Sequence, residues 1–405
     1  MRFGELNFAG HCRAPSFGSN PIVSLWSISC GYALVAAATL YSVIAWLAAK
    51  PPVRSPPRRS QHSASNETPK VTILKPLCGV EPETYDCLRS FCDQSYPEFQ
   101  IIFGIADSED PAIAVVERLQ KEFPQRDLRL VVDRRQHGSS RKISNLINMM
   151  TEASHEYLLL ADSDVRVRPD YLSNVVAPLL DLDVGIVTCP YRGVSRHGVW
   201  SMLGSMFINE WFMPSVQVAA RAGSRSFAFG ATIALRRQVL TQIGGFGVIA
   251  NHLADDYRLG ELSRGLGLRT VLSEVEVEVA VVENTFGILV HHELRWLRTI
   301  RAVRPLSYCF CFVTFGLPVA LLGTVLAGGS LIAAAGLAIT ALARAMLHFK
   351  KRSPKAPFAQ LTLVFLREFL SLGMWGWSFM TRRVRWRNEH YHVFRDGSAL
   401  PIVRV

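Results

Sequence analysis

The stretch YLLLADSDVRV, residues 157–167, places two carboxylates directly after a short apolar run. The run indicates a buried strand, and Asp162 and Asp164 follow at its carboxyl end. Ligands of open α/β sheets bind at this end of the strands. Two carboxylates one residue apart can share a hard divalent cation, Mg²⁺ or Mn²⁺, which commonly bridges to substrate phosphates. The stretch therefore predicts a metal-diphosphate site at one edge of a sheet.

A second D-x-D provides an internal control for this interpretation. Asp181 and Asp183 have no strand-like run before them, which is typical of a solvated loop. The first D-x-D differs because other candidate residues accompany it along the chain: Asp107, Asp255, Asp256, Arg295 and Trp296. These companions turn a weak pattern into a strong one.

Short apolar runs recur between helix-length stretches in the middle of the chain. They are VTILK (71–75), FQIIFGI (99–105), LRLVV (128–132), YLLLA (157–161) and VGIVT (184–188). This alternation favours the α/β class, with a mostly parallel sheet covered by helices. We place this domain at residues 70–305, after a linker at residues 50–69 that is rich in Pro, Ser and Arg.

The first apolar region predicts a membrane anchor. Residues 22–48, which follow an N-terminal tail (1–21), are long enough to span a bilayer. A retained anchor is favoured over a cleavable signal peptide because the run starts late and is long. More basic residues follow the run than precede it, which places the middle domain in the cytoplasm.

A second apolar region lies after the middle domain. Residues 306–347 predict two crossings joined at Gly328 and Gly329, with one long buried helix as the alternative. Basic residues flank both sides of this region, which favours an even number of crossings. In the basic loop and tail at residues 350–405, an apolar stretch (358–380) is interrupted by charged side chains, and we predict an interfacial helix there.

The net charge of +11 does not indicate a nucleic-acid partner. Basic residues crowd beside the apolar runs and form no continuous stripe along a helix, so anionic lipid headgroups are the favoured partner. The eight cysteines include no C-x-x-C pair, and Cys309 and Cys311 fall in a predicted membrane segment. The sequence therefore indicates neither a zinc site nor a disulfide framework.

The strand ends predict how a nucleotide diphosphate would bind. Asp107 would face the same crevice as Asp162 and accept hydrogen bonds from a ribose or a base; its alternative role is to cap a helix starting near Pro111. Asp162 and Asp164 would hold the metal, which neutralises the charge of a departing diphosphate. This chemistry needs no nucleophilic side chain.

Asp256, in HLADDYRLGE, is the candidate general base. An alcohol is too weak an acid to ionise first, so the base removes its proton as the new bond forms. Asp255 competes for this role, and either residue could instead be only the N-cap of the following helix.

Three further residues would bind the nucleotide sugar. Lys142 follows a loop with Gly138 and starts a helix whose N-terminus could face an anion, with an ordinary surface lysine as the alternative. The Arg295 guanidinium would hold phosphate oxygens and the Trp296 indole would close the crevice. The alternative for this pair is an interfacial anchor.

The order of these motifs resembles a known series. Asp107, Asp162-Ser163-Asp164, Asp256 and Arg295-Trp296 are similar to the D, D-x-D, D, (Q/R)-x-x-R-W pattern of processive and lipid-directed GT-A glycosyltransferases. A closer resemblance is to the ceramide glucosyltransferase family, glycosyltransferase family 21, over roughly residues 70–305. It is carried by VTILKPLCGVEP, DSEDPAIAV, SRKISNLIN, ADSDVRV, FGATIALRR and ADDYRLGE.

The resemblance implies a GT-A domain that transfers a sugar, with inversion, from a UDP-sugar to a lipid hydroxyl on the cytoplasmic face of a membrane. Asp107 would contact the nucleotide, Asp162 and Asp164 the metal diphosphate, and Asp256 would be the base. Within the family, HELRWLRTIR and NHLADDY are most similar to bacterial hopanoid-biosynthesis-associated members. That branch implies the bacterial inner membrane.

Two departures favour the hopanoid branch, with UDP-N-acetylglucosamine as donor and bacteriohopanetetrol as acceptor. Asp164 is present although ceramide-type members often lack it, and His292 stands where Gln or Arg is expected. The alternative is transfer of glucose from UDP-glucose to ceramide. A processive polysaccharide synthase, a glycoside hydrolase and a non-catalytic lipid-binding scaffold are less favoured; the synthase would need more crossings, and a hydrolase needs no metal-diphosphate pair.

Overall fold

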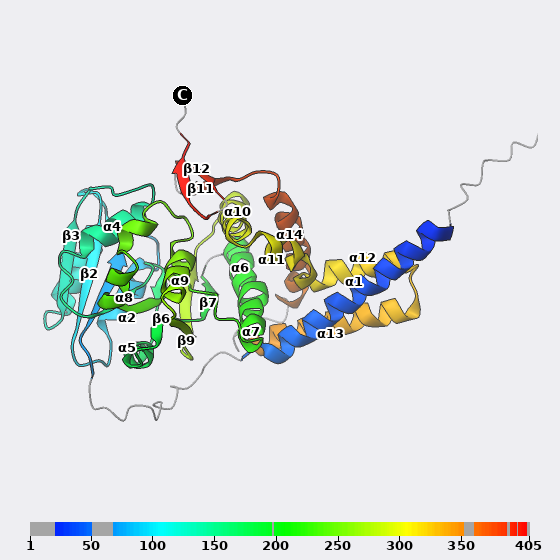
Figure 1. Cartoon of the computed structure of the whole chain (residues 1–405), viewed down its shortest axis with the longest axis horizontal. Coiled ribbons are helices and arrows are strands. Elements are labelled where there is room, and N and C mark those ends of the chain that lie inside the picture. Colours follow the sequence, from blue (N-terminus) through cyan, green and yellow to red (C-terminus); the bar gives the residue numbers. More distant parts are fainter. Residues whose placement is uncertain are drawn as a thin grey trace, which may run out of the picture.

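The computed structural model describes residues 21–50, 68–196, 198–351, 360–386, 389–394 and 396–402. The predicted N-terminal tail and most of the predicted linker lie outside these residues. The described chain forms an α/β domain, a group of long apolar helices beside it, and a small C-terminal sheet (Figure 1).

The central sheet of the α/β domain has seven strands in the order β3-β2-β1-β4-β8-β6-β9. Their bounds are β1 Val71–Pro76, β2 Phe99–Ile105, β3 Asp127–Val132, β4 Tyr157–Leu160, β6 Val184–Thr188, β8 Ile233–Arg236 and β9 Arg269–Leu272. All five predicted strands are present, and the pairs β3-β2, β2-β1, β1-β4 and β6-β9 are parallel. The predicted α/β class with a mostly parallel sheet is confirmed. The sequence did not predict β8, which runs antiparallel to β4 and β6.

Helices cover both faces of this sheet because its strands are apolar on both sides. Ile73 and Ile101 pack on one side with α2, α3 and α5, whereas Leu74 and Ile102 pack on the other with α4, α8 and α9. Successive side chains of a strand point to opposite faces, which explains this division. The helices are α2 Thr84–Cys92, α3 Ala112–Glu122, α4 Arg141–Met149, α5 Tyr171–Val176, α8 Arg237–Gln242 and α9 Asp255–Gly265.

A smaller sheet of three strands lies beside the long helices. It consists of β5 Val165–Arg166, β10 Val277–Val281 and β7 Tyr191–Ser195. Its neighbours along the chain are α6 Gly198–Met206, a π-helical segment Phe207–Phe212, α7 Met213–Arg221 and α10 Phe286–Val303. These helices connect the α/β domain to the apolar helices (Figure 1).

The apolar helices form a bundle at one end of the molecule. Helix α1, Pro21–Ala48, packs against α12, Gly316–Leu326, and α13, Leu331–Lys351. Gly328 and Gly329 make the turn between α12 and α13 with φ of 68° and 70°, which favours glycine. Two of the described helices, α1 and α13, are long and apolar enough to span a membrane.

Among the described residues, one further span would consist of a bent pair of helices. The segment Pro305–Thr314, which contains α11 (Pro305–Phe310), meets α12 at 74°. Helix α14, Gln360–Ser378, packs on α10 and α12. Its two charged side chains are buried and paired: Arg367 with Glu293 of α10, and Glu368 with Arg344 of α13.

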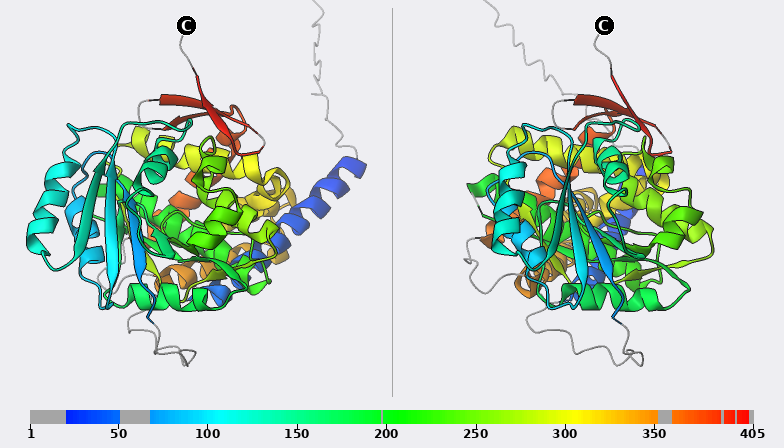
Figure 2. Two further views of the ribbon diagram at one scale, coloured as in Figure 1. Left: turned by 60° about the vertical axis from the view of Figure 1, so that its left-hand side comes forward. Right: turned by 90° about the vertical axis from the view of Figure 1, so that its left-hand side faces the viewer.

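The C-terminal sheet lies over the α/β domain (Figure 2). Its antiparallel strands are β11 Arg383–Trp386, β12 Glu389–Val393 and β13 Ala399–Pro401. Its buried side chains pack against Leu253 and Ala302, which belong to the loop before α9 and to α10.

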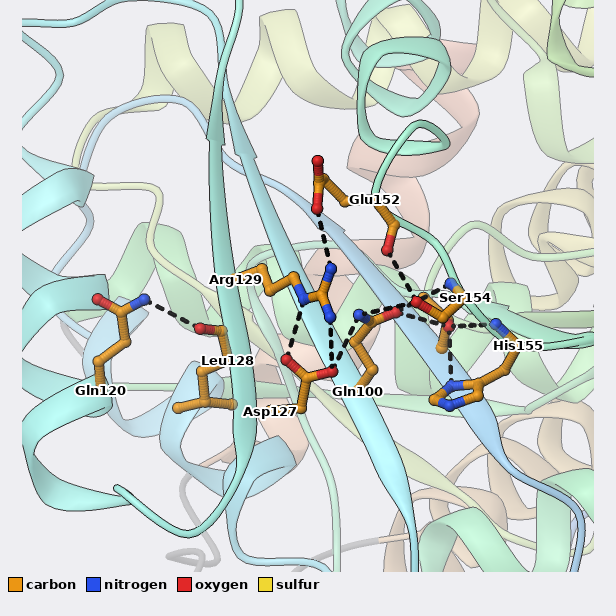
Figure 3. Close-up of polar contacts among 9 residues, drawn as sticks. Gln100, Gln120, Asp127, Leu128, Arg129, Glu152, Ser154 and His155 are labelled. Carbon is orange, nitrogen blue, oxygen red and sulfur yellow. Dashed lines mark hydrogen bonds and ion pairs between the residues drawn. The ribbon is translucent and has the colours of Figure 1, made fainter.

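Polar side chains also occupy the amino ends of the central strands (Figure 3). Gln100 of β2 accepts a hydrogen bond from Thr72 Oγ1 at 3.0 Å and donates one to Asp127 Oδ2 at 3.0 Å. Arg129 Nη1 donates to Glu152 at 2.9 Å, and its Nε donates to Asp127 at 3.0 Å. Each of these side chains has a partner, so this end of the sheet is a closed hydrogen-bonded network.

Candidate active site

The carboxyl ends of the strands carry four carboxylates around one lysine. Asp162 and Asp164 follow β4, and Asp255 and Asp256 lie in the first turn of α9; we call these four the carboxylate cluster. Lys142, in the first turn of α4, joins the two pairs. Its Nζ lies 2.6 Å from Asp162 Oδ1 and 3.7 Å from Asp255 Oδ2. The Lys142 side chain is only 21% exposed, so it is not an ordinary surface lysine.

Backbone donors hold Asp256. Its Oδ2 accepts a hydrogen bond from the Gly230 N–H at 2.9 Å, and its Oδ1 accepts one from the Tyr257 N–H at 2.7 Å. Asp255 Oδ1 accepts the Asp256 N–H at 2.8 Å. The N-cap of α9 is Ala254, so neither aspartate is the helix cap that the sequence left open.

Gly230 lies at the centre of the cluster, just before β8. A Cβ added there would stand 3.1 Å from Asp162 Oδ2, 3.3 Å from Lys142 Nζ and 3.7 Å from Asp256 Oδ2. A side chain at this position would therefore crowd Asp162 on one side and Asp256 on the other. Sequence reasoning did not single out Gly230 as a site residue, and its only signal was its place in the family-like stretch FGATIALRR.

Burial and crowding raise the pKa of three of the four carboxyl groups. Burial and then the charge of Asp162 raise the pKa of Asp164 to about 7, and burial and then Asp255 raise the pKa of Asp256 to about 6. Burial also raises the pKa of Asp255. Burial opposes the charge of Lys142, but Asp162 and Asp255 outweigh it and raise the lysine pKa. The cluster thus favours an additional positive charge.

Helix α10 brings Arg295 and Trp296 close to the carboxylate cluster. Burial lowers the pKa of Arg295, and all four members of the carboxylate cluster oppose that shift, so the guanidinium lies in their field. The Trp296 ring lies 6.3 Å from Tyr191 and 5.6 Å from Phe212, between centroids. Burial and then Asp256 raise the pKa of Tyr191, which places this aromatic group beside the carboxylates. The Arg-Trp element therefore lies beside the carboxylate cluster and is more than a membrane-interface anchor.

Asp107 lies apart from the cluster, exposed on the loop after β2. Its Oδ1 accepts a hydrogen bond from the Glu109 N–H at 3.1 Å. The N-cap of α3 is Pro111, so Asp107 does not have the alternative role as its cap; the carboxylate next to the start of α3 is Asp110, whose Oδ1 accepts the Ala112 N–H at 2.8 Å. Asp107 follows β2 and Asp162 follows β4, and β1 lies between these two strands in the sheet. Asp107 and Asp162 therefore lie at the same carboxyl end of the sheet, separated by two strand spacings, about 10 Å.

Lys75 is a further site-proximal residue that the sequence analysis did not select. It is the last residue but one of β1, is fully buried, and donates from Nζ to the Asp162 carbonyl oxygen at 2.5 Å. The ammonium also lies 3.8 Å from the centre of the Phe91 ring. Burial lowers its pKa to about 8. The available signal was a lysine inside an otherwise apolar strand, which is rare unless the lysine is paired.

The donor atoms fit a divalent metal bound together with a diphosphate. Among the described residues, no group of three or more His, Cys, Asp and Glu side chains could hold a metal by itself. Mg²⁺ commonly takes one or two protein carboxylates and completes its shell with phosphate oxygens and waters. Asp162 and Asp164 supply two carboxylates of this kind, and the raised pKa of Asp164 reflects negative charge that a cation would neutralise.

Comparison with known proteins assigns the family. The model of glycosyl transferase family 21 matches residues 30–399, which is nearly the whole chain. The chain belongs to glycosyl transferase family 21. Among family relatives, ceramide glucosyltransferase 1 of Caenorhabditis elegans is 23% identical over 343 residues, covering 81% of this chain and 72% of the relative. The ceramide glucosyltransferase of Gibberella zeae is 29% identical over 152 residues, covering 35% of this chain and 28% of the relative.

A solved structure supports the GT-A fold of this family 21 member. The mannosyltransferase PcManGT from Pyrobaculum calidifontis, in complex with GDP-Man and Mn²⁺, superposes with a TM-score of 0.52 and 21% identity. The match covers 86% of this chain and 98% of that protein. The predicted GT-A fold is confirmed, and the family identifies the chain as a glycosyltransferase. The relatives support the ceramide alternative better than the favoured hopanoid interpretation.

Proposed function

We propose that this family 21 member transfers glucose, with inversion, from UDP-glucose to the primary hydroxyl of a ceramide-type lipid. The observation that carries the proposal is the meeting of Asp162 with Asp256 across Gly230 and Lys142. It puts a candidate diphosphate site next to a candidate base. The ceramide glucosyltransferase relatives supply the donor and acceptor class.

Asp162 and Asp164 would hold Mg²⁺ or Mn²⁺ against the diphosphate of the donor. The bound cation would neutralise the charge of the departing UDP. Lys142 and Arg295 provide two fixed cations next to the same carboxylates and would bind phosphate oxygens once the metal has taken over the carboxylates. Asp107, at the end of β2, would accept hydrogen bonds from the nucleoside.

Asp256 would act as the general base. The acceptor oxygen forms a bond to the anomeric carbon, the bond from that carbon to the UDP oxygen breaks, and the hydroxyl proton passes to Asp256. A pKa of about 6 leaves this carboxylate ionised at neutral pH yet more basic than an ordinary aspartate. Asp255 is the weaker candidate, because its Oδ2 faces the Lys142 ammonium, whereas the partners of both Asp256 oxygens are neutral backbone N–H groups.

The lipid acceptor would approach from the side of the apolar helices. The aromatic group around Trp296 lies between these helices and the carboxylate cluster and would line the route of the lipid. We place the enzyme in a membrane, spanning it more than once with the catalytic domain in the cytoplasm. If the source is bacterial, this is the inner membrane.

A second candidate is transfer from UDP-N-acetylglucosamine to bacteriohopanetetrol. It is favoured by His292, which departs from the Gln or Arg of the family pattern. In the structure its Nδ1 lies 2.5 Å from Glu283 Oε1, and its ring lies 5.4 Å from Trp296. A different side chain beside the acceptor route would select a different acceptor.

A radiolabel transfer assay tests these proposals. Membranes containing the protein receive UDP-glucose or UDP-N-acetylglucosamine together with ceramide or bacteriohopanetetrol, with and without divalent metal. Metal-dependent labelling of ceramide that disappears in Asp256→Asn supports the first proposal. Labelling of the hopanoid alone would replace donor and acceptor but keep the mechanism. Transfer to neither lipid, by folded protein supplied with metal, would refute both.

A further inference from the structure

The C-terminal sheet contacts the loop that leads into α9. Ala399 N–H donates to the Asn251 carbonyl oxygen at 2.7 Å, and Leu253 N–H donates to the Gly397 carbonyl oxygen at 3.1 Å. His252 and Ser398 form an antiparallel bridge between these two segments. The paired backbone thus ends two residues before Asp255, the first residue of α9.

The same strand contacts the loop that leads into α4. Ser139 Oγ donates to the Ala399 carbonyl oxygen at 2.6 Å. Ser139 and Ser140 also bond to the α9 loop, through the Asn251 side chain at 2.9 Å and the Ala250 carbonyl oxygen at 2.8 Å. Ser140 caps α4, whose first turn carries Lys142.

The segment that enters the C-terminal sheet is also bonded to α10. Arg298 Nη1 donates to the Arg383 carbonyl oxygen at 2.8 Å, and Arg301 Nη2 donates to that of Thr381 at 2.8 Å. The C-terminal segment therefore contacts α10, which carries the Arg-Trp element, and the loops that lead into α4 and α9, which carry the lysine and the base.

We propose that residues 397–399 position the general base. This proposal rests on the proposed function. The strand holds the amino ends of α4 and α9 at a fixed separation. This separation determines the 3.7 Å distance between Lys142 Nζ and Asp255 Oδ2, and it determines the direction in which the Asp256 side chain points. A base must lie within hydrogen-bond reach of the proton that it removes, and small displacements of such groups cost large factors in rate. Ser139 and Ala399 are positioning residues, since they act through α4 and α9.

Two substitutions remove two of these hydrogen bonds and weaken the contact, while the bond from the Leu253 N–H to the Gly397 carbonyl oxygen remains. Ala399→Pro deletes the N–H that faces Asn251. The substitution keeps the β12-β13 ladder, because the Ala399 N–H bonds to Asn251 and not to β12. Bonds between the two segments are made by other residues, such as the Phe394 N–H to the Ser398 carbonyl oxygen and the Ile402 N–H to the His390 carbonyl oxygen. Ser139→Ala deletes the hydroxyl, and Ser139→Thr, which keeps it, is the matched control.

The experiment measures steady-state transfer and amide hydrogen exchange on the full-length protein in detergent. In the Ala399→Pro, Ser139→Ala double variant we expect kcat to fall roughly tenfold or more, with the KM for the UDP-sugar within about twofold. We also expect faster exchange at residues 138–146 and 250–256, with no change at residues 157–164. When Ser139→Thr replaces Ser139→Ala in the double variant, the part of the fall in kcat that comes from the lost Ser139 hydroxyl should disappear.

Other outcomes overturn the inference. A double variant with a lower melting temperature but unchanged kcat per folded molecule and unchanged exchange at residues 250–256 would show a merely structural contact. A change in donor KM alone would also contradict it. If wild-type protein transfers no sugar, the proposed function fails, and exchange at residues 250–256 alone decides whether the strand holds the base loop.

Discussion

At the amino ends of β1, β2 and β3, polar side chains form a closed network of hydrogen bonds, whereas at the carboxyl ends of β1 and β4 like charges crowd together. In the network, the Gln100 side chain bonds to Thr72 and to Asp127 (Figure 3). At the opposite end, Asp164 and Asp256 have raised pKa values because of burial and neighbouring carboxylates. The same sheet thus has one end where polar side chains are mutually paired and one end where carboxylates repel one another even though they have hydrogen-bond partners.

This difference distinguishes stability from function. Polar groups with complete partners stabilise the fold, because an unpartnered buried group is costly. Carboxylates held close together lose stability unless a ligand brings compensating charge, and such arrangements concentrate at functional sites. We therefore expect substitutions at the carboxyl end to change activity, and substitutions at the amino end to change stability.

The largest effect is expected from removing the base. Asp256→Asn cannot accept the acceptor proton, so kcat should fall by about 10² to 10⁴-fold. Asp127→Asn, at the amino end, should leave kcat within about twofold. The measurement is sugar transfer at saturating donor and acceptor. A wild-type rate in Asp256→Asn, with a large loss in Asp255→Asn, would move the base to Asp255.

Metal dependence should come next. Chelation should abolish transfer and added Mg²⁺ or Mn²⁺ should restore it. Asp164→Asn should raise the metal concentration for half-maximal rate by roughly tenfold, since a contact to a charged group contributes about 1.5–3 kcal/mol. Titration of the metal in the transfer assay checks this. Full activity in the chelator would remove the metal from the mechanism.

A smaller loss should follow from filling the centre of the cluster. Gly230→Ala places a methyl group 3.1 Å from Asp162 Oδ2, which would displace the carboxylate and lower kcat by about tenfold. Gly247→Ala is the control, because a Cβ there meets nothing within 4 Å. Equal rates for the two variants would show that the cluster adapts without cost.

The raised pKa values also predict how stability depends on pH. Asp164 binds its proton more tightly in the folded protein, with a pKa of about 7 against an ordinary 3.8, so protonation stabilises the fold at low pH. That contribution is complete below about pH 4 and is lost as pH rises through about 7. The melting temperature of metal-free protein should therefore fall over this range, and fall less in Asp164→Asn. Identical profiles for the two proteins would contradict this assignment.

The smallest effect on activity is expected at the amino end. Gln100→Leu removes one hydrogen bond from each of Thr72 and Asp127, which keep His155 and Arg129 as partners, and should lower the melting temperature by a few degrees, corresponding to about 1–3 kcal/mol. The kcat of the folded fraction should stay unchanged. A loss of kcat as large as that of Gly230→Ala would mean that the two ends of the sheet are coupled.

The sequence alone predicted much of the fold and part of the site. The five strand runs, the apolar helices and the D-x-D at residues 162–164 are local patterns, since side-chain periodicity and strand ends depend on neighbouring residues. The antiparallel β8 was missed, because pairing direction depends on how the chain returns to the sheet. Lys75 was missed because its partner, the Asp162 carbonyl oxygen, lies after another strand, β4, far away in the sequence.

The sequence by itself determined which residue types were available: paired carboxylates after a strand, apolar runs long enough for a bilayer, and a family-like order of motifs. Only the tertiary structure decided which of them meet. Lys142 joins Asp162 to Asp255, Gly230 leaves room between Asp162 and Asp256, and residues 397–399 lie against the loop before α9. These contacts connect segments far apart in the chain, and their geometry depends on packing of the whole sheet and its helices, which no local pattern encodes.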